Sequence, residues 1–373
     1  MSAIEGPIVF TGGGTGGHLY PAIAIADALA DPEGTAFIGT ADRLEATIVP
    51  KAGYRLYTVR SRPLVRTLSF AFAGTLLTNA RGVWQSARLL ARLRPRMVIA
   101  TGGYVCFPVV IAARLLRGLR MVQAPIALLE PNARPGLTNR LLAPLVDEVW
   151  GAFPTGDARF RGKYVHSGIP VRASLAHLPP REEALGRLGL SPTRQTLLAM
   201  GGSQGARSIN DALTTIVTNG ALPPGWQLLH VTGEGEYDRV RATLGADAGP
   251  AVRPYLHDLA DAYAAADLVL ARAGASTLGE LAAVGRPALL VPYPHAADDH
   301  QSRNAELFAA CGAAAVLSDR ELVAGGLRVA LERATAPGQL AAMRAAAERL
   351  QNGSPIATIL ARIAALGARK TLG

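Results

Sequence analysis

The sequence predicts an α/β protein built from two parallel, doubly wound domains. Short apolar runs alternate with longer helical patterns along most of the chain, which is typical of parallel sheets covered by helices. With 373 residues, the chain is longer than one hydrophobic core usually organises, so two domains are expected. An apolar run, two glycines, a hydroxyl residue and a helical pattern follow one another at residues 8–29 and again at residues 196–210. This weak repeat indicates a duplicated half.

The first expected strand, at residues 8–11, leads into a loop with five glycines in six positions, residues 12–17, and a helical pattern follows. Glycines let a ligand approach backbone N–H groups, and a helix N-terminus favours negative charge. The loop therefore predicts an anion site that suits a phosphate. It lacks the lysine of a P-loop, and the acid that would bind a dinucleotide ribose is poorly placed after the next strand.

Further strands of the first half are expected at residues 35–38, 97–101, 127–129 and 148–150, and a helix is expected around residues 84–94. Polar or glycine-rich turns follow two of these strands, at residues 102–104 and 130–132. Ligands of open α/β sheets bind at the carboxyl ends of the strands. These two turns and the glycine loop are therefore expected to lie on one rim.

Basic charge is concentrated in the first half. Residues 1–168 hold 19 Lys and Arg against 10 Asp and Glu, and no acid lies between Ala46 and Leu129. This asymmetry predicts an anionic partner, which could be nucleic acid, anionic lipid or a phosphorylated substrate, although a generally basic proteome is an alternative explanation. Within residues 60–77, apolar side chains are interleaved with Arg62 and Arg66, which favours a membrane-facing surface. Packing in the first core explains each apolar residue equally well when it is taken singly.

The two cysteines, Cys106 and Cys311, are too few for a disulfide framework. A reducing cytoplasm is therefore expected, with each cysteine packed as a small apolar residue. No signal peptide and no membrane-spanning helix are predicted.

A break between domains is expected near residues 166–172. Strands are expected after it at residues 196–200, 227–231, 251–253, 268–271 and 288–291. The chain then ends in helical patterns at residues 340–350 and 356–366. The last helix needs a face on which to bury its apolar stripe, and the first half is the expected one.

Residues 270–281 combine a strand, a turn of small and hydroxyl residues, and a helix. Thr277 and the turn amides can hold phosphate, and Glu280 can accept hydrogen bonds from both vicinal hydroxyls of a ribose. The alternative is that Ser276 and Glu280 only cap the helix and complement its dipole.

A proline-rich loop at residues 291–299 precedes a helix that begins with the polar residues His300, Gln301 and Asn304. Such a cluster is typical of a site that binds sugar hydroxyls; a solvated helix start is the alternative. His295, Asp298 and Asp299 lie close by in the sequence, but their spacing fits no familiar zinc pattern. No tightly bound metal and no other cofactor is expected.

Seven motifs in order carry a resemblance to a known family: residues 13–22, 39–43, 102–104, 132–139, 201–207, 272–280 and 300–305. Together they resemble the MurG family, within glycosyltransferase family 28, over nearly the whole chain. The resemblance implies a GT-B fold, in which two Rossmann-like domains face a cleft and the C-terminal helix crosses back to the first domain. The expected domains are residues 1–167 with about 352–373, and residues 168–351.

The resemblance also implies an activity. The enzyme would move N-acetylglucosamine (GlcNAc) from UDP-GlcNAc to the muramyl 4-hydroxyl of undecaprenyl-pyrophosphoryl-MurNAc-pentapeptide, with inversion at the anomeric carbon, during peptidoglycan synthesis. It would act as a peripheral protein on the cytoplasmic face of the cell membrane. An anionic membrane surface and other cell-wall synthesis proteins are candidate partners, and nucleic acid is not expected.

The resemblance assigns site residues one by one. Donor binding would involve Thr15, Gly16, Gly17, Asn132, Arg172, Ser203, Leu256, Ala275, Ser276, Thr277, Leu278, Gly279, Glu280 and Gln301. Acceptor binding would involve Gly13, Gly14 and Tyr104, and residues 15–18, Glu130 and Asn132 would also face the acceptor. Arg172 and Leu256 would lie by the uracil and Ser203 by the diphosphate. Glu280 would bind the ribose, and Gln301 would read the GlcNAc hydroxyls.

His18 is the candidate general base, because its ordinary pKa range suits proton transfer. Hydrogen bonding to the sugar or phosphate is a rival role for His18, and Glu130 is the alternative base. Helix N-termini at Ser203 and Thr277 would stabilise the departing UDP. The family often shows His-Glu-Gln-Asn where this chain has Leu129-Glu-Pro-Asn132, and Cys106-Phe107-Pro108 replaces smaller, more polar residues.

Three other functions fit parts of the pattern. A diacylglycerol glycosyltransferase of the same fold would share the donor half and differ in its acceptor loops. A UDP-GlcNAc 2-epimerase would need more catalytic acids than the acid-free flank provides. A non-catalytic, membrane-bound nucleotide-sugar-binding protein would bind UDP-GlcNAc without consuming it.

Overall fold

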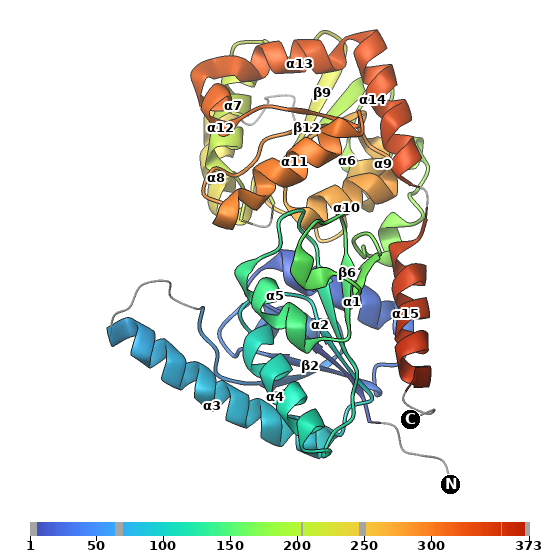
Figure 1. The fold of residues 1–373 in the computed structure, drawn as a ribbon. Coiled ribbons are helices and arrows are strands. Elements are labelled where there is room, and N and C mark those ends of the chain that lie inside the picture. Colours follow the sequence, from blue (N-terminus) through green and yellow to red (C-terminus); the bar gives the residue numbers. More distant parts are fainter. Residues whose placement is uncertain (1–5, 64–69, 203, 246–250, 352, 370–373) are drawn as a thin grey trace. The chain divides into compact units, whose positions relative to one another are not determined.

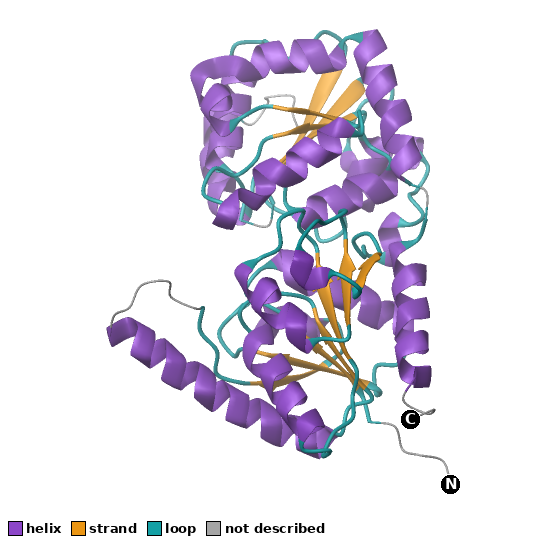
Figure 2. Cartoon of the chain, in the orientation of Figure 1, coloured by secondary structure: helices purple, strands orange, loops and turns teal. Residues whose placement is uncertain are grey.

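The computed structural model describes residues 6–63, 70–202, 204–245, 251–351 and 353–369. The chain divides into two compact units (Figure 1). Unit 1 comprises Met1–Arg172 and Ser354–Gly373, and unit 2 comprises Ala173–Gly353. Each unit is a parallel sheet with helices on both faces, as the strand and helix alternation predicts (Figure 2).

The described part of unit 1 contains a seven-stranded parallel sheet with the order β3-β2-β1-β4-β5-β6-β7. Its strands are β1 (Ile8–Thr11), β2 (Thr35–Gly39), β3 (Arg55–Thr58), β4 (Met97–Ala100), β5 (Ile126–Glu130), β6 (Glu148–Gly151) and β7 (Tyr164–His166). Its helices are α1 (Gly16–Leu29), α2 (Leu44–Lys51), α3 (Phe70–Leu93), α4 (Cys106–Gly118), α5 (Leu137–Leu142) and α15 (Pro355–Arg369), with short turns η1 (Ala143–Leu145) and η2 (Ala158–Phe160).

Alternate residues of each central strand of unit 1 enter different cores, because side chains of a strand point to opposite faces. Val9 joins the core beneath α3 and α4, whereas Phe10 joins the core beneath α1 and α15. Ile359 and Leu366 of α15 are buried in the second core, and the Arg362 guanidinium pairs with the Glu148 carboxylate on β6. The expectation that the last helix packs on the first half is confirmed.

The described part of unit 2 contains a six-stranded parallel sheet with the order β10-β9-β8-β11-β12-β13. Its strands are β8 (Gln195–Met200), β9 (Trp226–Val231), β10 (Ala251–Arg253), β11 (Leu268–Ala271), β12 (Ala288–Leu290) and β13 (Ala314–Val316). Its helices are α6 (Arg181–Leu188), α7 (Arg207–Thr218), α8 (Glu234–Leu244), α9 (Ala260–Ala265), α10 (Ala275–Val284), α11 (His300–Ala310), α12 (Asp319–Glu321), α13 (Leu327–Thr335) and α14 (Pro337–Leu350), with short turns η3 (Ala173–Leu175), η4 (Ala297–Asp299) and η5 (Leu322–Gly326).

Three strands are absent from the sequence prediction: β3, β7 and β13. Two of them, β3 and β7, form the edges of the first sheet, and β13 forms an edge of the second. None of the three contains a fully buried residue, whereas β1 and β11 are buried throughout. A strand covered on only part of its surface lacks the continuous apolar run that marks a central parallel strand.

Two other expectations differ from the structure. The helix predicted around residues 84–94 begins much earlier, at Phe70, and forms the long α3, while residues 64–69, which include Arg66, lie outside the described part. Cys106 is buried as predicted, but Cys311 is exposed because it follows the last turn of α11 at the surface. No described helix combines the length and apolar character needed to cross a bilayer.

Candidate functional site

The glycine loop of unit 1 places His18 in the first turn of α1. Its Nδ1 atom lies 3.0 Å from the carbonyl oxygen of Thr101, the residue that follows β4. A carbonyl oxygen only accepts, so Nδ1 carries the proton and donates it in this bond. The neutral imidazole therefore has its lone pair on Nε2, the nitrogen that a general base would use.

The turn after β4 is packed against His18 and the glycine loop. A Cβ atom on Gly102 would lie 2.5 Å from His18 Nδ1, and one on Gly103 would lie 2.4 Å from the carbonyl oxygen of Gly13. Gly102 also has a φ of +102°, a value that other residues rarely adopt. A Cβ atom on Gly14 would lie 3.2 Å from the Tyr104 ring. The prediction that these two loops share a rim is confirmed.

Glu45, in the first turn of α2, holds the glycine loop in place and is absent from the site residues predicted from the sequence. Its carboxylate accepts hydrogen bonds from the Gly14 N–H at 3.1 Å, the Thr40 N–H at 3.1 Å and the Thr40 hydroxyl at 2.7 Å. The side chain is 1% exposed, and a Cβ atom on Gly13 would collide with it. A buried carboxylate needs such donors. In the sequence, the one sign of this role is that Glu45 closely follows β2, the strand that pairs with β1.

Glu130 ends β5 and organises the loop that follows it. Its carboxylate accepts from the Asn132 N–H at 2.9 Å, the Gly136 N–H at 3.1 Å and the Asn139 Nδ2 at 2.8 Å. The Asn132 Nδ2 makes a further, longer bond of 3.4 Å to the same carboxylate. Burial raises the pKa of Glu130 to about 7, although these hydrogen bonds act in the opposite direction.

Other predicted residues of unit 1 lie nearby in the fold. Thr15 is the N-cap of α1, and its exposed side chain makes no capping hydrogen bond. Gly16 and Gly17 open the helix. The Arg172 guanidinium lies 5.1 Å from the centroid of the Tyr20 ring on α1. Arg172 therefore packs within unit 1, although the sequence predicts it to belong to the second domain, at residues 168–351.

Cys106 lies under the rim as a protonated thiol. Its Sγ atom lies 3.3 Å from the Gly102 N–H and 3.1 Å from the carbonyl oxygen of Thr11. Complete burial raises the pKa of Cys106 to about 12. The thiol therefore supports the turn and is unsuited to nucleophilic chemistry at neutral pH.

In unit 2, α10 begins directly after β11 with Gly274 as its N-cap. Ser276 therefore lies inside the helix, and its buried hydroxyl has no hydrogen-bond partner among the described residues. Glu280 lies beyond the first turn, where its Oε2 atom accepts a hydrogen bond of 2.8 Å from the Tyr263 hydroxyl. The alternative in which Ser276 and Glu280 serve only as cap and first-turn acid is wrong.

The remaining residues assigned to α10 divide by exposure. Ala275, Leu278 and Gly279 are buried in the packing of the helix, whereas Thr277 is partly exposed.

The polar cluster at the start of α11 is held against the neighbouring loops. Gln301 Oε1 accepts from the Tyr293 N–H at 3.0 Å, and the buried Asn304 donates to the carbonyl oxygen of Ala273 at 3.3 Å. Arg272 binds the Asp319 carboxylate at 2.7 Å and lies 5.5 Å from the centroid of the Tyr293 ring. These contacts hold Gln301, in the first turn of α11, against the loop at Tyr293, and they hold Asn304 against the segment that precedes α10.

Two further assignments are less direct. Ser203 lies outside the described residues, and the helix expected to begin there begins at Arg207, so its N-terminus is not at Ser203. Leu256 is half-buried in the segment between β10 and α9. Within the described ranges, no three His, Cys, Asp or Glu side chains group as metal ligands, and the absence of a tightly bound metal remains a prediction.

Comparisons with known proteins cover both units. The glycosyltransferase family 28 N-terminal domain matches residues 8–150, and the glycosyltransferase family 28 C-terminal domain matches residues 196–359. A protein of Moorella thermoacetica is 43% identical over 95% of this chain and 97% of its own length. A protein of Desulforudis audaxviator is 39% identical over 98% of this chain and 99% of its own length. Both are named UDP-N-acetylglucosamine–N-acetylmuramyl-(pentapeptide) pyrophosphoryl-undecaprenol N-acetylglucosamine transferase.

Solved structures agree. The crystal structure of Acinetobacter baumannii MurG aligns with a TM-score of 0.71 and 26% identity, over 96% of this chain and 99% of that one. A UDP co-structure of S. aureus MnaA aligns with a TM-score of 0.66 at 12% identity, over 95% of each chain, which bears on the fold alone. The predicted GT-B fold with two Rossmann-like domains is confirmed. Because full-length relatives and both domain descriptions agree, the chain belongs to the MurG family of glycosyltransferase family 28.

Proposed function

We propose that this protein transfers GlcNAc from UDP-GlcNAc to the muramyl 4-hydroxyl of an undecaprenyl-pyrophosphoryl-MurNAc-pentapeptide. Relatives that align over nearly the whole chain carry the name of this activity. The observation in the structure that best supports it is the orientation of His18, whose Nδ1 is held by Thr101 at the rim of the unit 1 sheet. That orientation leaves Nε2 as the basic nitrogen beside a loop suited to a diphosphate.

The proposed reaction is a single inverting displacement. The muramyl 4-hydroxyl oxygen attacks the anomeric carbon of GlcNAc and forms the new glycosidic bond, while His18 Nε2 takes the hydroxyl proton. The bond between the anomeric carbon and the UDP oxygen breaks, and UDP leaves with the electron pair. The N-terminus of α10, near Ser276 and Thr277, supplies dipole stabilisation for the charge that develops on the diphosphate.

His18 suits the base role better than Glu130. The Glu130 carboxylate is 3% exposed and already accepts hydrogen bonds from Asn132, Gly136 and Asn139. Proton abstraction by Glu130 would require it to exchange these donors for a substrate hydroxyl. Glu130 is therefore proposed as a positioning residue for the loop that carries Asn132, which would face the substrates.

The donor would be bound by unit 2. The Glu280 carboxylate can accept from the ribose hydroxyls, and the buried Ser276 hydroxyl adds a donor at the start of α10. Gln301 would bind the sugar hydroxyls from the first turn of α11, where its side chain accepts a hydrogen bond from the Tyr293 N–H. Transfer is proposed to need no tightly bound metal, because the spacing of residues 295–300 matches no familiar ligand pattern. Activity retained in EDTA would support this proposal.

Unit 1 would bind the acceptor and contact the membrane surface. Helices α3 and α4 pack together, as Figure 1 shows. Their outer surface and the segment after α4 present large exposed apolar side chains: Leu76, Leu77, Trp84, Leu115, Leu119 and Met121. The Arg88 guanidinium lies 4.8 Å from the centroid of the Trp84 ring. Apolar side chains among basic groups suit a peripheral contact with an anionic membrane, here proposed for the cytoplasmic face.

The test is transfer of labelled sugar with paired substrates. UDP-GlcNAc and UDP-glucose would each be offered with a lipid-linked muramyl-pentapeptide, with diacylglycerol, or without acceptor. The proposal expects transfer from UDP-GlcNAc to the muramyl lipid alone. Transfer to diacylglycerol instead would identify a glycolipid synthase, and donor binding without turnover in any mixture would identify a binding protein.

A further inference from the structure

Tyr263 is a buried residue whose side chain contacts the Glu280 carboxylate. It lies on α9, its ring is fully buried, and its hydroxyl donates to Glu280 Oε2 over 2.8 Å. Glu280 itself is only partly buried. A tyrosine hydroxyl taken out of water needs a polar partner, and a carboxylate is a strong one. The contact therefore ties a carboxylate that reaches solvent to a side chain that does not.

The backbone of Tyr263 is fixed as firmly as its side chain. Arg286, just after the end of α10, donates from Nε to the Tyr263 carbonyl oxygen over 2.8 Å. The hydroxyl contact and this carbonyl contact hold α9 against both ends of the segment from Glu280 to Arg286. Tyr263 is therefore a fixed point relative to α10.

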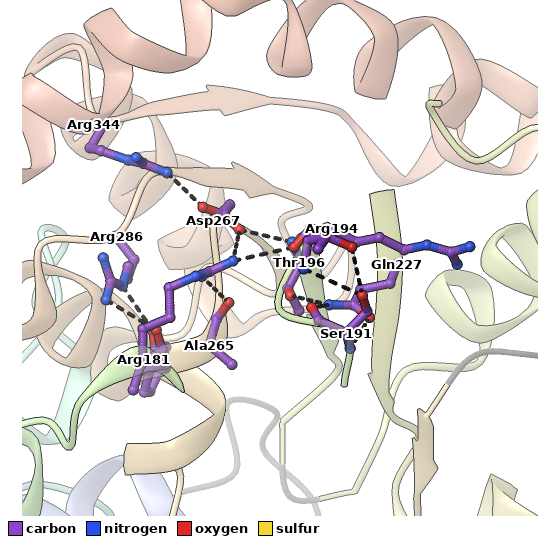
Figure 3. A network of polar contacts seen from close by, with 12 residues as sticks. Arg181, Ser191, Arg194, Thr196, Gln227, Ala265, Asp267, Arg286 and Arg344 are labelled. Atoms are coloured by element: carbon purple, nitrogen blue, oxygen red, sulfur yellow. Dashed lines mark hydrogen bonds and ion pairs between the residues drawn. The ribbon is translucent and has the colours of Figure 1, made fainter. Parts of the chain in front are cut away.

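The chain beyond Tyr263 is anchored by a network of arginines around Asp267 (Figure 3). Arg181 donates to the carbonyl oxygen of Ala265 and pairs with the Asp267 carboxylate at 2.7 Å. Arg344 pairs with the other carboxylate oxygen of Asp267 at 2.9 Å, and the Thr196 N–H donates to Asp267 at 2.8 Å. These contacts join α6, α14 and β8 to the link between α9 and β11.

A carboxylate that recognises two vicinal hydroxyls must present both oxygens in one orientation. A glutamate side chain rotates about three bonds, so it loses conformational entropy when it is fixed. Each carboxylate oxygen can accept two hydrogen bonds. The Tyr263 hydroxyl uses one of these acceptor positions, on Oε2.

We propose that Tyr263 is a positioning residue for the nucleotide: it holds the Glu280 carboxylate in the orientation that accepts hydrogen bonds from the ribose hydroxyls. The inference rests on the proposed function, because it takes Glu280 as the group that binds the ribose. Tyr263 itself, being buried, does not touch the ligand in this account. Its effect on the nucleotide passes through Glu280.

The experiment is calorimetric titration of the full chain with UDP and with 2′,3′-dideoxy-UDP. Tyr263→Phe keeps the buried ring and removes the hydroxyl. The variant is expected to weaken UDP binding about fivefold, which is the effect of losing a modest positioning hydrogen bond. Binding of the dideoxy nucleotide is expected to be unchanged. Equal losses for both nucleotides, or no loss for UDP, would contradict the inference.

A double-mutant comparison separates this inference from the proposed function. In a Glu280→Ala background, Tyr263→Phe is expected to cause no further loss of UDP affinity. If Glu280→Ala leaves UDP affinity unchanged, the assignment of the ribose site fails. If Glu280→Ala weakens binding and Tyr263→Phe does not, only the positioning role fails. Tyr237→Phe, on α8 of the same unit, is the matched control and is expected to bind UDP as the unmodified protein does.

Discussion

The Nδ1–H group of His18 donates a hydrogen bond of 3.0 Å to the carbonyl oxygen of Thr101. This bond joins the helix that follows β1 to the turn that follows β4, two strands that are neighbours in the sheet. The imidazole is therefore oriented by backbone that the sheet itself fixes. Its basic nitrogen is defined before any substrate arrives, which lowers the cost of reaching a reactive geometry.

Gly102→Ala is expected to reduce turnover strongly while leaving donor affinity intact. The new methyl group would collide with His18 Nδ1, and the φ of +102° would be strained. A shift of the catalytic group by about 1 Å costs roughly 100-fold in rate. The measurement is kcat for transfer alongside UDP calorimetry. Gly156→Ala is the control, since no atom lies within 4 Å of its added Cβ. Normal turnover by Gly102→Ala would show that this contact does not position His18.

Glu45→Gln tests the support beneath the glycine loop. An amide in place of the carboxylate would turn an N–H₂ group toward the Gly14 or Thr40 donors and lose hydrogen bonds. Leaving a buried donor unsatisfied costs about 1–3 kcal/mol, so the melting temperature should fall. The KM for acceptor should rise while the Kd for UDP stays constant. Glu33→Gln is an exposed control on the same unit. A variant that melts earlier but keeps its acceptor KM would limit Glu45 to a structural role.

Because of the buried His230, we expect the free energy of unfolding of unit 2 to fall in mild acid. His230 lies fully buried on β9, its Nε2 bonds Asn210 Oδ1 at 2.9 Å, and burial lowers its pKa to about 4. Between pH 6.5 and 4, the His230 imidazole is protonated in the unfolded chain and stays neutral in the folded chain. The unfolding free energy should therefore fall by about 3 kcal/mol as the pH drops from 6.5 to 4.

Hydrogen exchange of the β9 amides between pH 4 and 7, corrected for the intrinsic exchange rate, measures this loss. His230→Gln removes the titrating group and should flatten the dependence in that range. A slope that is the same in the variant would assign the acid sensitivity to other residues.

Arg62 and Arg81 are exposed on the basic surface around α3 and should attract anionic lipid. Each basic residue near such a surface contributes about 1 kcal/mol, so reversing both to Glu should weaken vesicle binding more than 10-fold. Cosedimentation with phosphatidylglycerol vesicles measures the effect. Arg320→Glu with Arg328→Glu, on unit 2, is the matched control. If both pairs of reversals weaken binding alike, only net charge matters and the membrane face is not at α3.

The sequence predicts the parts of the fold that carry a strong pattern. Central strands such as β1 and β4 are buried apolar runs, and the glycine turns after them mark the rim where Gly102 packs against His18 and Gly14 against Tyr104. Edge strands such as β3 are half-exposed and lack that pattern.

Contacts between residues distant in sequence leave no local signal. The sequence pattern around residues 270–281 indicates Glu280 but gives no sign of Tyr263, because the two side chains, 17 residues apart on α10 and α9, meet only in the folded chain. Glu130 is a possible base on the sequence alone, and the donors that surround its carboxylate are brought together only by the fold. In the sequence, Glu45 has the pattern of an ordinary acid in the first turn of a helix. Its hydrogen bonds to Gly14 and Thr40 form only in the folded chain.

The most direct test of the account compares His18→Ala with the unmodified protein in transfer from labelled UDP-GlcNAc to a lipid-linked muramyl-pentapeptide. Loss of a general base should slow turnover by roughly 100-fold or more. The Kd for UDP-GlcNAc, measured on the same preparations, should remain nearly unchanged because Glu280 and Gln301, the side chains proposed to bind the ribose and the sugar, lie in unit 2. A near-normal rate in the variant would contradict the assignment of His18 as the base.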